Sequence, residues 1–382
     1  MIPFHRPSIG EEEIAEVVDT LRSGWLTTGQ KVKGFEKAFA DYVGASHAVA
    51  VSSCTAALHL ALEAIGIGPG DEVIVPTYTF TSTGAVVTHL GARPVLVDCR
   101  RDTFNIDVAT VEPMISQRTK AIIPVHIAGQ SCDMDPIMEL ARRHGIRVIE
   151  DAAHALPAMY KGRTIGTIGD FTAFSFYATK TITTGEGGMV TTARGEDAER
   201  VRRMSLHGLS GDAWNRYSDK GKWYYEVVDF GFKYNMTDLA ASIGIHQLQR
   251  SDAFYKRRRE IARAYHRGLS DIEACIIPRE ADYGTHAWHL YILQLDLPAL
   301  AGGRDAFIRS LRHGGIGTSV HFIPLHLHPA YQKAFQYHAG AFPAAEHVFD
   351  RAVSLPIYPN MTDTDVESVI DVVGDTVKAL RR

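Results

Sequence analysis

The stretch that decides the fold runs from Gly169 to Thr192 and reads GDFTAFSFYATKTITTGEGGMVTT. Its first part, 171–177, is apolar and aromatic, and its last part, 189–192, has the composition of a second strand. Lys180 lies between the two predicted strands, among small and hydroxylated residues. A lysine that is partly desolvated in such a place has a lowered ammonium pKa, and its free amine can form a Schiff base with a carbonyl. Because most lysines are solvated, an ordinary surface lysine in a loop is the alternative.

A carboxylate upstream strengthens the first interpretation. Residues 146–151, IRVIED, predict a short buried strand that ends in Asp151 and is soon followed by His154. In open α/β sheets, ligands bind beyond the carboxyl ends of the strands. Pyridoxal 5′-phosphate (PLP) needs a Schiff-base lysine and an acid that keeps its pyridine nitrogen protonated. Lys180 and Asp151 supply that pair, and Ser175 adds a hydroxyl suited to the phosphate.

The composition is that of a soluble globular protein. The 382 residues, 45% apolar and 22% charged, are enough for two domains with sizeable cores. A formal net charge of −4 gives no general attraction to nucleic acid or to an anionic membrane, and no apolar stretch approaches the length of a membrane span. The basic run at 256–259 is interpreted as a solvated helix face. The four cysteines are scattered without metal-ligand spacing and the N-terminus lacks a signal pattern, so we expect a cytoplasmic location and no metal.

Two loops in the first part of the chain are candidate ligand contacts. Trp25, in the loop 23–29, is compatible with a binding wall or with an anchor to the core. This loop follows a helix predicted over 10–22, which Ser8 would cap and which would carry its apolar residues on one face. The loop 52–57 joins a strand to a helix N-terminus, an arrangement that binds phosphate through backbone N–H groups. An N-capped helix without a ligand explains the same pattern.

Strand and helix patterns alternate along the first part of the chain. The apolar runs around 72–76, 93–97 and 119–125 predict buried strands separated by helices. This alternation predicts a mainly parallel sheet with helices on both faces. Tyr78 and Phe80 follow one of these strands, and either aromatic ring could stack on a flat ligand or pack in the core.

The last third of the chain predicts a smaller α+β domain. A helix expected from near Leu239 to about Gly268 would lead into it. We therefore expect a larger domain of residues 1–245 and a smaller one of residues 246–382.

Two further segments are candidates for substrate contact. Residues 208–228 have little periodicity and predict a long functional loop. His321, His326 and His328 lie close together and could contact a substrate, bind a metal or pack. No carboxylate or cysteine lies near them in the sequence, which argues against the metal.

Taken together, these motifs resemble those of a known family. SFYATKTITTGEGG around Lys180, IEDAAHA upstream and GFKYNMTDL downstream resemble the DegT/StrS family of PLP-dependent nucleotide-sugar aminotransferases. The likeness extends from PFHRPSIGEEE through PLHLHPAY to LPIYPNMTD, so it covers essentially the whole chain. It implies the fold-type-I aminotransferase architecture, with a mainly parallel seven-stranded sheet flanked by helices and a smaller α+β C-terminal domain. Members that aminate the 4-keto carbon of UDP-linked sugars look most similar. Some members carry histidine at the lysine position and remove a hydroxyl, so Lys180 implies transamination instead.

The resemblance also implies residue roles. Lys180 would form the Schiff base and act as general acid and base, and Asp151 would pair with the pyridinium nitrogen. The remaining cofactor contacts would be His154 near the cofactor, Phe80 on the ring face, Ser175, Thr55 and Ala56 at the phosphate, and Asn235 at the phosphate of the neighbouring subunit's cofactor. The sugar-nucleotide contacts would be Trp25, Thr28, His321 and His326. The implied partners are a nucleotide sugar, glutamate as amino donor and a second copy of the chain in a homodimer with shared sites.

Two other classes of protein remain open at this point. One is a lyase, aldolase or desulfurase on the same PLP fold. The other is a non-catalytic PLP-fold regulatory module, which would not need to retain Lys180. The residues leave open which keto sugar and which nucleotide are used, whether C4 or C3 is aminated, and the stereochemistry of the product amine.

Overall fold

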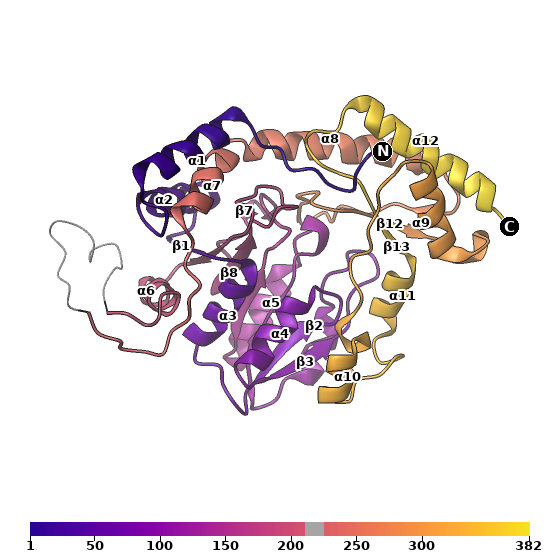
Figure 1. Ribbon diagram of the computed structural model, residues 1–382. Coiled ribbons are helices and arrows are strands. Elements are labelled where there is room, and N and C mark those ends of the chain that lie inside the picture. Colours follow the sequence, from indigo (N-terminus) through magenta and orange to yellow (C-terminus); the bar gives the residue numbers. More distant parts are fainter. Residues whose placement is uncertain (211–224) are drawn as a thin grey trace.

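The computed structural model describes residues 1–210 and 225–382, and a seven-stranded sheet forms the centre of the larger lobe (Figure 1). In spatial order its strands are β1 (His47–Val51), β9 (Gly188–Thr192), β8 (Phe171–Ser175), β5 (Arg147–Asp151), β4 (Thr119–Ile122), β2 (Glu72–Pro76) and β3 (Arg93–Val97). The pairings from β8 to β3 are all parallel, whereas β9 is antiparallel to both β1 and β8. The predicted mainly parallel sheet is therefore confirmed.

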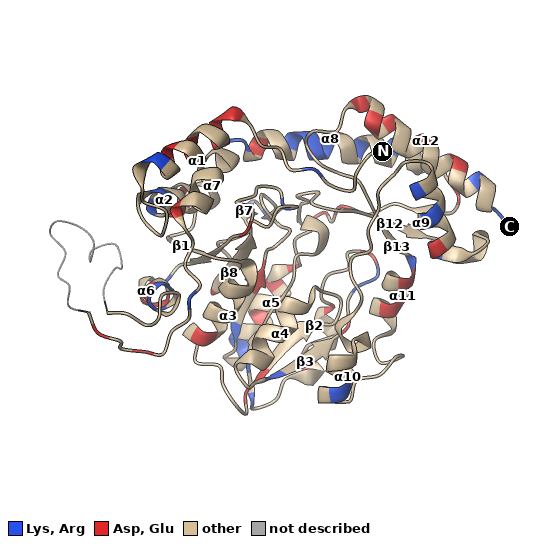
Figure 2. Cartoon of the chain, in the orientation of Figure 1, with Lys and Arg blue, Asp and Glu red and all other residues tan. Residues whose placement is uncertain are grey.

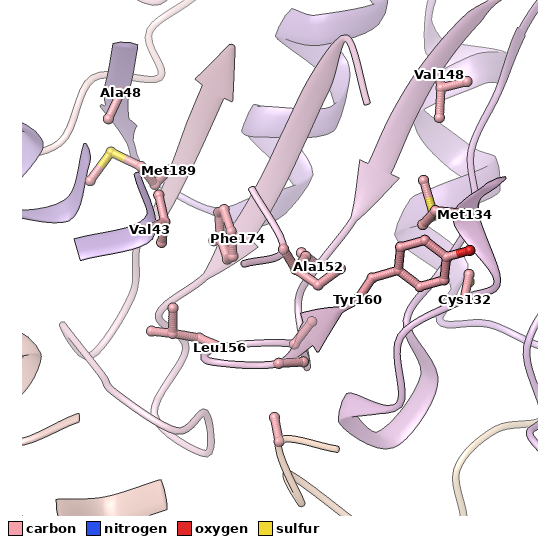
Figure 3. Close-up of a cluster of buried hydrophobic side chains, with 14 of the residues drawn as sticks. Val43, Ala48, Cys132, Met134, Val148, Ala152, Leu156, Tyr160, Phe174 and Met189 are labelled. Atoms are coloured by element: carbon pink, nitrogen blue, oxygen red, sulfur yellow. The ribbon is translucent and has the colours of Figure 1, made fainter. Parts of the chain in front are cut away.

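Helices cover both faces of this sheet, because alternate residues of a buried strand point to opposite sides. The first face packs against α2 (Gln30–Val43), α5 (Met134–His144) and α7 (Asp238–Gln249). The second packs against α3 (Cys54–Ala64), α4 (Thr81–His89) and α6 (Gly195–Met204). In β5, Val148 enters the core of the first face and Ile149 that of the second. Figure 3 shows part of the first core, where Phe174 and Met189 lie near Val43.

A smaller lobe has its own hydrophobic core. This core is built from α8 (Ser251–Leu269), α9 (Gly303–His313), α12 (Asp363–Leu380) and a three-stranded antiparallel sheet of β10 (Cys275–Ile276), β12 (Tyr291–Leu295) and β13 (Ala352–Leu355). The other elements are α10 (Pro329–Phe335), α11 (Pro343–Arg351) and the short strands β6 (Met159–Tyr160), β7 (Arg163–Thr164) and β11 (Gly284–Thr285). The small domain of residues 246–382 stays a prediction. Part of it forms this separate core, but Phe254 and Ala287 pack into the first core of the larger lobe, and Leu325 and Tyr331 into the second.

The first helix, α1 (Glu11–Ser23), is capped differently from the prediction. Ser8 does not cap it; the Gly10 N–H donates to Glu13 Oε2 at 2.8 Å instead. Ser8 Oγ accepts a hydrogen bond from Arg250 Nη2 at 3.0 Å. The cap prediction was wrong because a glutamate three residues into the helix reaches back to the cap N–H. The predicted apolar face of α1 exists, but it is partly exposed to solvent.

The single helix predicted from Leu239 to Gly268 is two helices, α7 and α8. Arg250, with φ −94° and ψ −1°, lies between them as the last cap residue of α7 and the first cap residue of α8. The basic run 256–259 is not a uniformly solvated face either, because Arg258 is fully buried. Its Nη1 donates to the carbonyl oxygens of Trp288, His289 and Ile357.

Two further segments lack long helices. Between β3 and β4 the chain forms a pair of 3₁₀ turns, Val108–Thr110 and Glu112–Met114, in place of an α-helix. Pro113 has no N–H with which to continue an α-helical ladder. Most of the loop predicted at 208–228 lies outside the described residues. No helix in the described part of the chain is long and apolar enough to cross a membrane.

Candidate active site

A cavity of about 380 Å³ lies at the ends of β5 and β8, where Asp151 and Ser175 are placed. Seven of the predicted site residues line it: Thr55, Phe80, Asp151, His154, Ser175, Lys180 and His321. Five others do not line it: Trp25, Thr28, Ala56, Asn235 and His326. The structure therefore brings together the residues expected at the cofactor and separates most of those expected at the substrate.

Lys180 is held at this cavity by a loop fixed through side-chain hydroxyls. Thr183 Oγ1 donates to the Phe176 carbonyl at 3.1 Å and accepts from the Gly185 N–H at 2.9 Å. The Thr184 N–H donates to the same carbonyl at 2.9 Å. These bonds fix the turn that follows the lysine, which explains the threonines and glycines of the sequence there.

The Lys180 side chain is partly exposed to the cavity but surrounded by protein. Desolvation lowers the pKa of its ammonium group from 10.5 to about 8, while the Asp151 carboxylate opposes this shift. Among the described residues, its Nζ has no hydrogen bond or ion pair. Burial raises the pKa of the Cys54 thiol, so this neighbour is neutral and the lysine faces no thiolate. Lys180 therefore loses its proton more readily than a solvated lysine, as a Schiff-base lysine must.

Asp151 ends β5 on the same side of the sheet as Ile149. Its Oδ2 accepts from Thr83 Oγ1 at 2.8 Å and its Oδ1 from the Ala153 N–H at 3.1 Å. Burial raises the pKa of this carboxyl, although these two donors and Lys180 oppose the shift. A buried carboxylate without a close cationic partner is destabilised, and a protonated ring nitrogen would supply that partner. No sequence pattern pointed to Thr83, which lies far from β5 in the chain.

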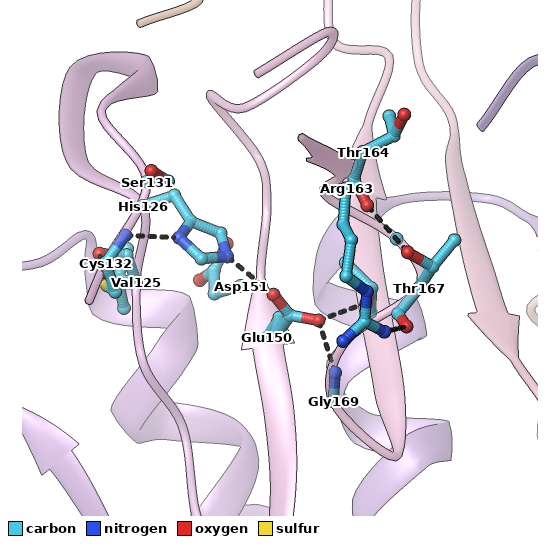
Figure 4. A network of polar contacts seen from close by, with 12 residues as sticks. Val125, His126, Ser131, Cys132, Glu150, Asp151, Arg163, Thr164, Thr167 and Gly169 are labelled. Carbon is cyan, nitrogen blue, oxygen red and sulfur yellow. Dashed lines mark hydrogen bonds and ion pairs between the residues drawn. The ribbon is translucent and has the colours of Figure 1, made fainter. Parts of the chain in front are cut away.

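Glu150 points to the opposite face of β5 and fixes this end of the strand (Figure 4). Its Oε1 accepts from the Gly169 N–H at 2.7 Å and from Thr172 Oγ1 at 2.9 Å. Its Oε2 lies 3.0 Å from His126 Nε2. Because the Cys132 N–H donates to His126 Nδ1 at 3.0 Å, the proton of the neutral ring is on Nε2 and is donated to the carboxylate. His126, Glu150 and Thr172 are buried, and this network positions the end of β5 that faces the cavity.

The N-terminus of α3 faces the same cavity. Ser53 caps this helix, and its Oγ accepts from the Ala56 N–H at 3.1 Å. The Ala56 amide, which was expected to bind phosphate, is thus already bonded within the chain. The backbone N–H groups of Cys54 and Thr55 make no hydrogen bond with any described residue, so they are available to an anion, as is the Ser175 hydroxyl on the same cavity.

Gly188, the first residue of β9, allows this turn to approach the sheet. A Cβ at this position would lie 2.5 Å from the carbonyl carbon of Ser53 and 2.7 Å from the backbone nitrogen of Cys54. Both are backbone atoms, so a side chain would displace the first turn of α3. The last glycine of the GEGG run is therefore required by the packing of the anion site.

Aromatic and histidine side chains line other parts of the cavity, together with the acidic Glu186. Phe80 is 56% exposed, which leaves its ring free to stack on a flat ligand, and Phe322 lies 6.0 Å from it between ring centroids. The ring of His154 stacks on that of Phe322, with 5.7 Å between the ring centroids. Burial lowers the pKa of His154 well below its usual value and that of His321 to about 4. These neutral imidazoles can exchange hydrogen bonds with an uncharged polar ligand.

The lining residues that sequence analysis missed include Phe4, His5, His289 and Phe322. His5 belongs to the N-terminal segment, which pairs with the small lobe. The Ile2 N–H donates to the Gly315 carbonyl and the Gly317 N–H to the Ile2 carbonyl, both at 2.8 Å. Burial lowers the pKa of His5 to about 4. The only sequence signal for the wall formed by the N-terminal segment is the run PFHRP before the first helix. This run does not indicate that the segment pairs with residues 315–317.

Trp25, Thr28 and Asn235 lie together, outside the cavity of Lys180. Asn235 Nδ2 donates to Thr28 Oγ1 at 2.7 Å, and Trp25 Nε1 donates to the Thr28 carbonyl at 3.2 Å. Asn235 borders two other hollows of the surface, one of which it shares with Thr28. Within one chain, these three side chains do not line the cavity with Lys180.

His326 also differs from the prediction. Its side chain is 0% exposed, with Nδ1 2.8 Å from Thr77 Oγ1 and Nε2 2.9 Å from Glu346 Oε1. It therefore fixes the contact between β2 and α11 and does not reach the cavity. In the part of the chain that the structure describes, no group of three or more His, Cys, Asp or Glu residues is placed to hold a metal ion.

The residues of the cavity fit PLP. Lys180 would hold the aldehyde carbon, Asp151 the protonated ring nitrogen, and the amides of Cys54 and Thr55 the phosphate. When bound, PLP supplies an electron sink for a carbanion formed next to the amine. Fold and site together define a PLP-dependent enzyme of fold type I.

Comparison with known proteins identifies the family. Residues 7–374 match the DegT/DnrJ/EryC1/StrS aminotransferase family, and the chain belongs to it. The spore coat polysaccharide biosynthesis protein SpsC of Bacillus subtilis is 55% identical over 378 residues, which are 99% of this chain and 97% of that protein.

Solved structures agree with this assignment. A putative sugar aminotransferase from Streptococcus pneumoniae, solved in its PMP and PLP forms, superposes with a TM-score of 0.93 at 36% identity, and the PMP form covers 99% of this chain and 100% of its own. PseC of Helicobacter pylori, an aminotransferase involved in the biosynthesis of pseudoaminic acid, gives a TM-score of 0.90 at 26% identity, over 99% and 100% of the two chains. The protein is a PLP-dependent aminotransferase, which confirms the predicted family, fold class and cofactor over the lyase and regulatory alternatives.

Proposed function

We propose that the protein transfers the amino group of glutamate to the C4 keto carbon of a nucleotide-linked sugar, for the synthesis of an amino sugar or a surface polysaccharide. The observation that carries the proposal is that Lys180 and Asp151 face one cavity in a chain of this aminotransferase family. The names of the similar proteins support a sugar as acceptor, since they include a sugar aminotransferase and a polysaccharide biosynthesis protein.

The chain's own residues can perform the proton transfers of this reaction. Lys180 Nζ, whose pKa is lowered to about 8, can accept and return a proton near neutral pH, as a general acid and base. The Asp151 carboxylate holds the positive charge at the ring nitrogen. The neutral His154 and His321 offer hydrogen bonds to sugar hydroxyls without placing another charge beside the lysine.

A panel of acceptors tests this function. The PLP-loaded protein is incubated with glutamate and with 4-keto and 3-keto sugar nucleotides, and both 2-oxoglutarate and the amino sugar are measured by mass spectrometry. We expect both products in equal amounts with a 4-keto acceptor, and neither with Lys180→Ala. Products formed with 3-keto acceptors alone would refute amination at C4. Production of 2-oxoglutarate without an amino sugar from any acceptor of the panel would refute the sugar nucleotide as substrate.

We further propose that the working unit is a homodimer in which Asn235 completes the cofactor site of the partner subunit. Asn235 lies outside the cavity of its own chain, next to an apolar hollow lined by Val17, Leu239, Ala240 and Ile243. On the same side, Ile14 and Leu21 of α1 are 49% and 52% exposed. An apolar surface of this kind favours burial against a second molecule.

Complementation between two inactive variants tests the shared site. Lys180→Ala and Asn235→Asp are mixed under conditions that allow subunits to exchange. If the sites are shared, each heterodimer has one site free of both substitutions, and up to about half of the wild-type activity per heterodimer returns. If exchange is confirmed and no activity returns, Asn235 acts within its own chain.

We also propose a cytoplasmic location. All four cysteines, at positions 54, 99, 132 and 275, are free thiols. Free thiols are typical of a reducing compartment. Fractionation of the producing cells tests this location. Activity recovered in the membrane or secreted fraction, and not in the cytosol, would refute it.

A further inference from the structure

A second cavity, of about 630 Å³, lies between α8 and the segment 277–288 of the small lobe. It shares no lining residue with the active-site cavity. One wall is a row of arginines at four-residue spacing, Arg259, Arg263 and Arg267, which places all three on one face of α8. Arg279 lies on the opposite wall. We refer to this cavity as the arginine groove.

The arginine groove carries an excess of positive charge in the described part of the chain. Among the described residues, no ion pair is formed by Arg259, Arg263, Arg267 or Arg279. Arg257, two residues before the row, does pair with Glu260 and Asp363. Of the residues that the structure describes, Glu280 is the one acid that lines the groove. Its Oε1 accepts from the His286 N–H at 2.9 Å. Figure 2 shows the basic positions gathered along α8. Four guanidinium groups around one hollow repel one another unless an anion lies between them.

His266 also lines the arginine groove and is held by contacts within the protein. Its Nδ1 lies 2.7 Å from the Ala262 carbonyl oxygen and 3.5 Å from the Tyr291 hydroxyl, and its Nε2 lies 2.9 Å from the Pro278 carbonyl oxygen. These contacts fix the ring between α8 and the segment that carries Arg279.

The geometry of the groove indicates which anion it fits. Residues four apart on a helix are about 6 Å apart along its axis, so two neighbouring guanidinium groups can bind adjacent anionic groups of one ligand. Arginine forms paired, parallel hydrogen bonds with phosphate. Ile277, Pro278 and Trp288 form an apolar side of the groove, and its volume is in the range of sites for organic ligands.

We propose that the arginine groove binds a phosphate-bearing ligand. Its phosphate groups contact Arg259, Arg263 and Arg267, and its organic part, where it has one, lies against Ile277 and Pro278. The site is separate from the cavity of Lys180, and its existence does not depend on which acceptor the enzyme aminates. Two sources share this chemistry, a nucleotide and inorganic pyrophosphate, and the experiment distinguishes them.

The test is calorimetric titration of the PLP-loaded enzyme with UDP and, separately, with inorganic pyrophosphate at low ionic strength. We expect saturable binding that Arg263→Glu weakens by about tenfold or more, because a charge-assisted contact is replaced by repulsion. Lys256→Glu is the matched control, since it makes the same change of charge on the same helix but outside the groove. It should change the affinity by less than about twofold. Tighter binding of UDP than of pyrophosphate indicates a nucleotide, and equal binding indicates the inorganic anion.

Hydrogen exchange locates the bound ligand, with protection expected at residues 259–267 and 277–280. Should Arg263→Glu fail to fold, as judged by circular dichroism, the milder Arg267→Gln with Arg279→Gln takes its place, with the same expected loss. The proposal is overturned if neither compound binds saturably. It is also overturned if the groove variant binds the ligand as tightly as wild type, which is the result expected for a ligand held only in the active site. The same holds if Lys256→Glu weakens binding as much as the groove variant does.

Discussion

Replacing Lys180 with methionine should stabilise the cofactor-free protein at pH 7. The ammonium group of Lys180 is poorly solvated, which lowers its pKa from 10.5 to about 8. At about 1.4 kcal/mol for each pH unit, this shift corresponds to about 3 kcal/mol that folding loses by desolvating the charge. Methionine has a similar length and no charge, so Lys180→Met removes that cost.

The effect should depend on pH in a defined window. Below about pH 8, lysine is protonated in both the folded and unfolded protein, and the full cost is present. Between pH 8 and 10.5 the unfolded state binds more protons than the folded state, so the wild-type protein gains stability as pH rises. Above pH 10.5 both states are neutral and this contribution disappears. The advantage of Lys180→Met should therefore be largest at pH 7 and should shrink as pH approaches 10.5.

Urea unfolding of the cofactor-free proteins at pH 7 and pH 9.5 measures this effect. The matched control is Lys256→Met, which removes the charge of an exposed lysine and should leave the pH dependence unchanged. The reasoning is refuted if Lys180→Met is no more stable than wild type at pH 7. It is equally refuted if the difference between the two proteins is the same at both pH values.

Three other substitutions have expected outcomes. Lys180→Ala should abolish amino transfer while the PLP site still forms, and multiple turnovers near the wild-type rate would remove the lysine from the mechanism. Asp151→Asn should bind PLP but react roughly a hundredfold more slowly, because a charge-assisted hydrogen bond of about 3 kcal/mol to the ring nitrogen is lost; a near-normal rate would assign that role to another residue. Gly188→Ala should lower the free energy of unfolding by about 1–3 kcal/mol, because its Cβ would overlap the backbone of Ser53 and Cys54; an unchanged urea midpoint would contradict the close approach.

The parts of the site carried by continuous motifs could be predicted from sequence. Asp151 ends an apolar strand, and Lys180 lies between two strand-like runs, so local patterns placed both at one edge of the sheet. The parallel sheet was predictable for the same reason, because buried strands and amphipathic helices alternate along the chain. Thr83, His5 and Phe322 join the site from distant segments, and no local pattern reports such contacts.

Burial was the least predictable property. Arg258 belongs to a run of four basic residues, yet it is fully enclosed, because three carbonyl oxygens that come from residues 288–289 and 357 meet its guanidinium. His326 is enclosed in a similar way between Thr77 and Glu346. In both cases the hydrogen-bond partners are distant in sequence. The residue type alone therefore suggested contact with solvent for Arg258 and with a ligand for His326.

The pairing of Ile2 with residues 315–317 has a consequence for how the enzyme is made. Phe4 and His5 form one wall of the active-site cavity, but the surface that positions them comes from the opposite end of the sequence. The ribosome synthesises the chain from its amino terminus, so these two residues leave the ribosome early. They acquire their native contacts only after the small lobe has been synthesised. The large lobe can fold around its own sheet before that point. A nascent chain that stops before residue 315 would therefore have the catalytic lysine in place and an active site open on one side.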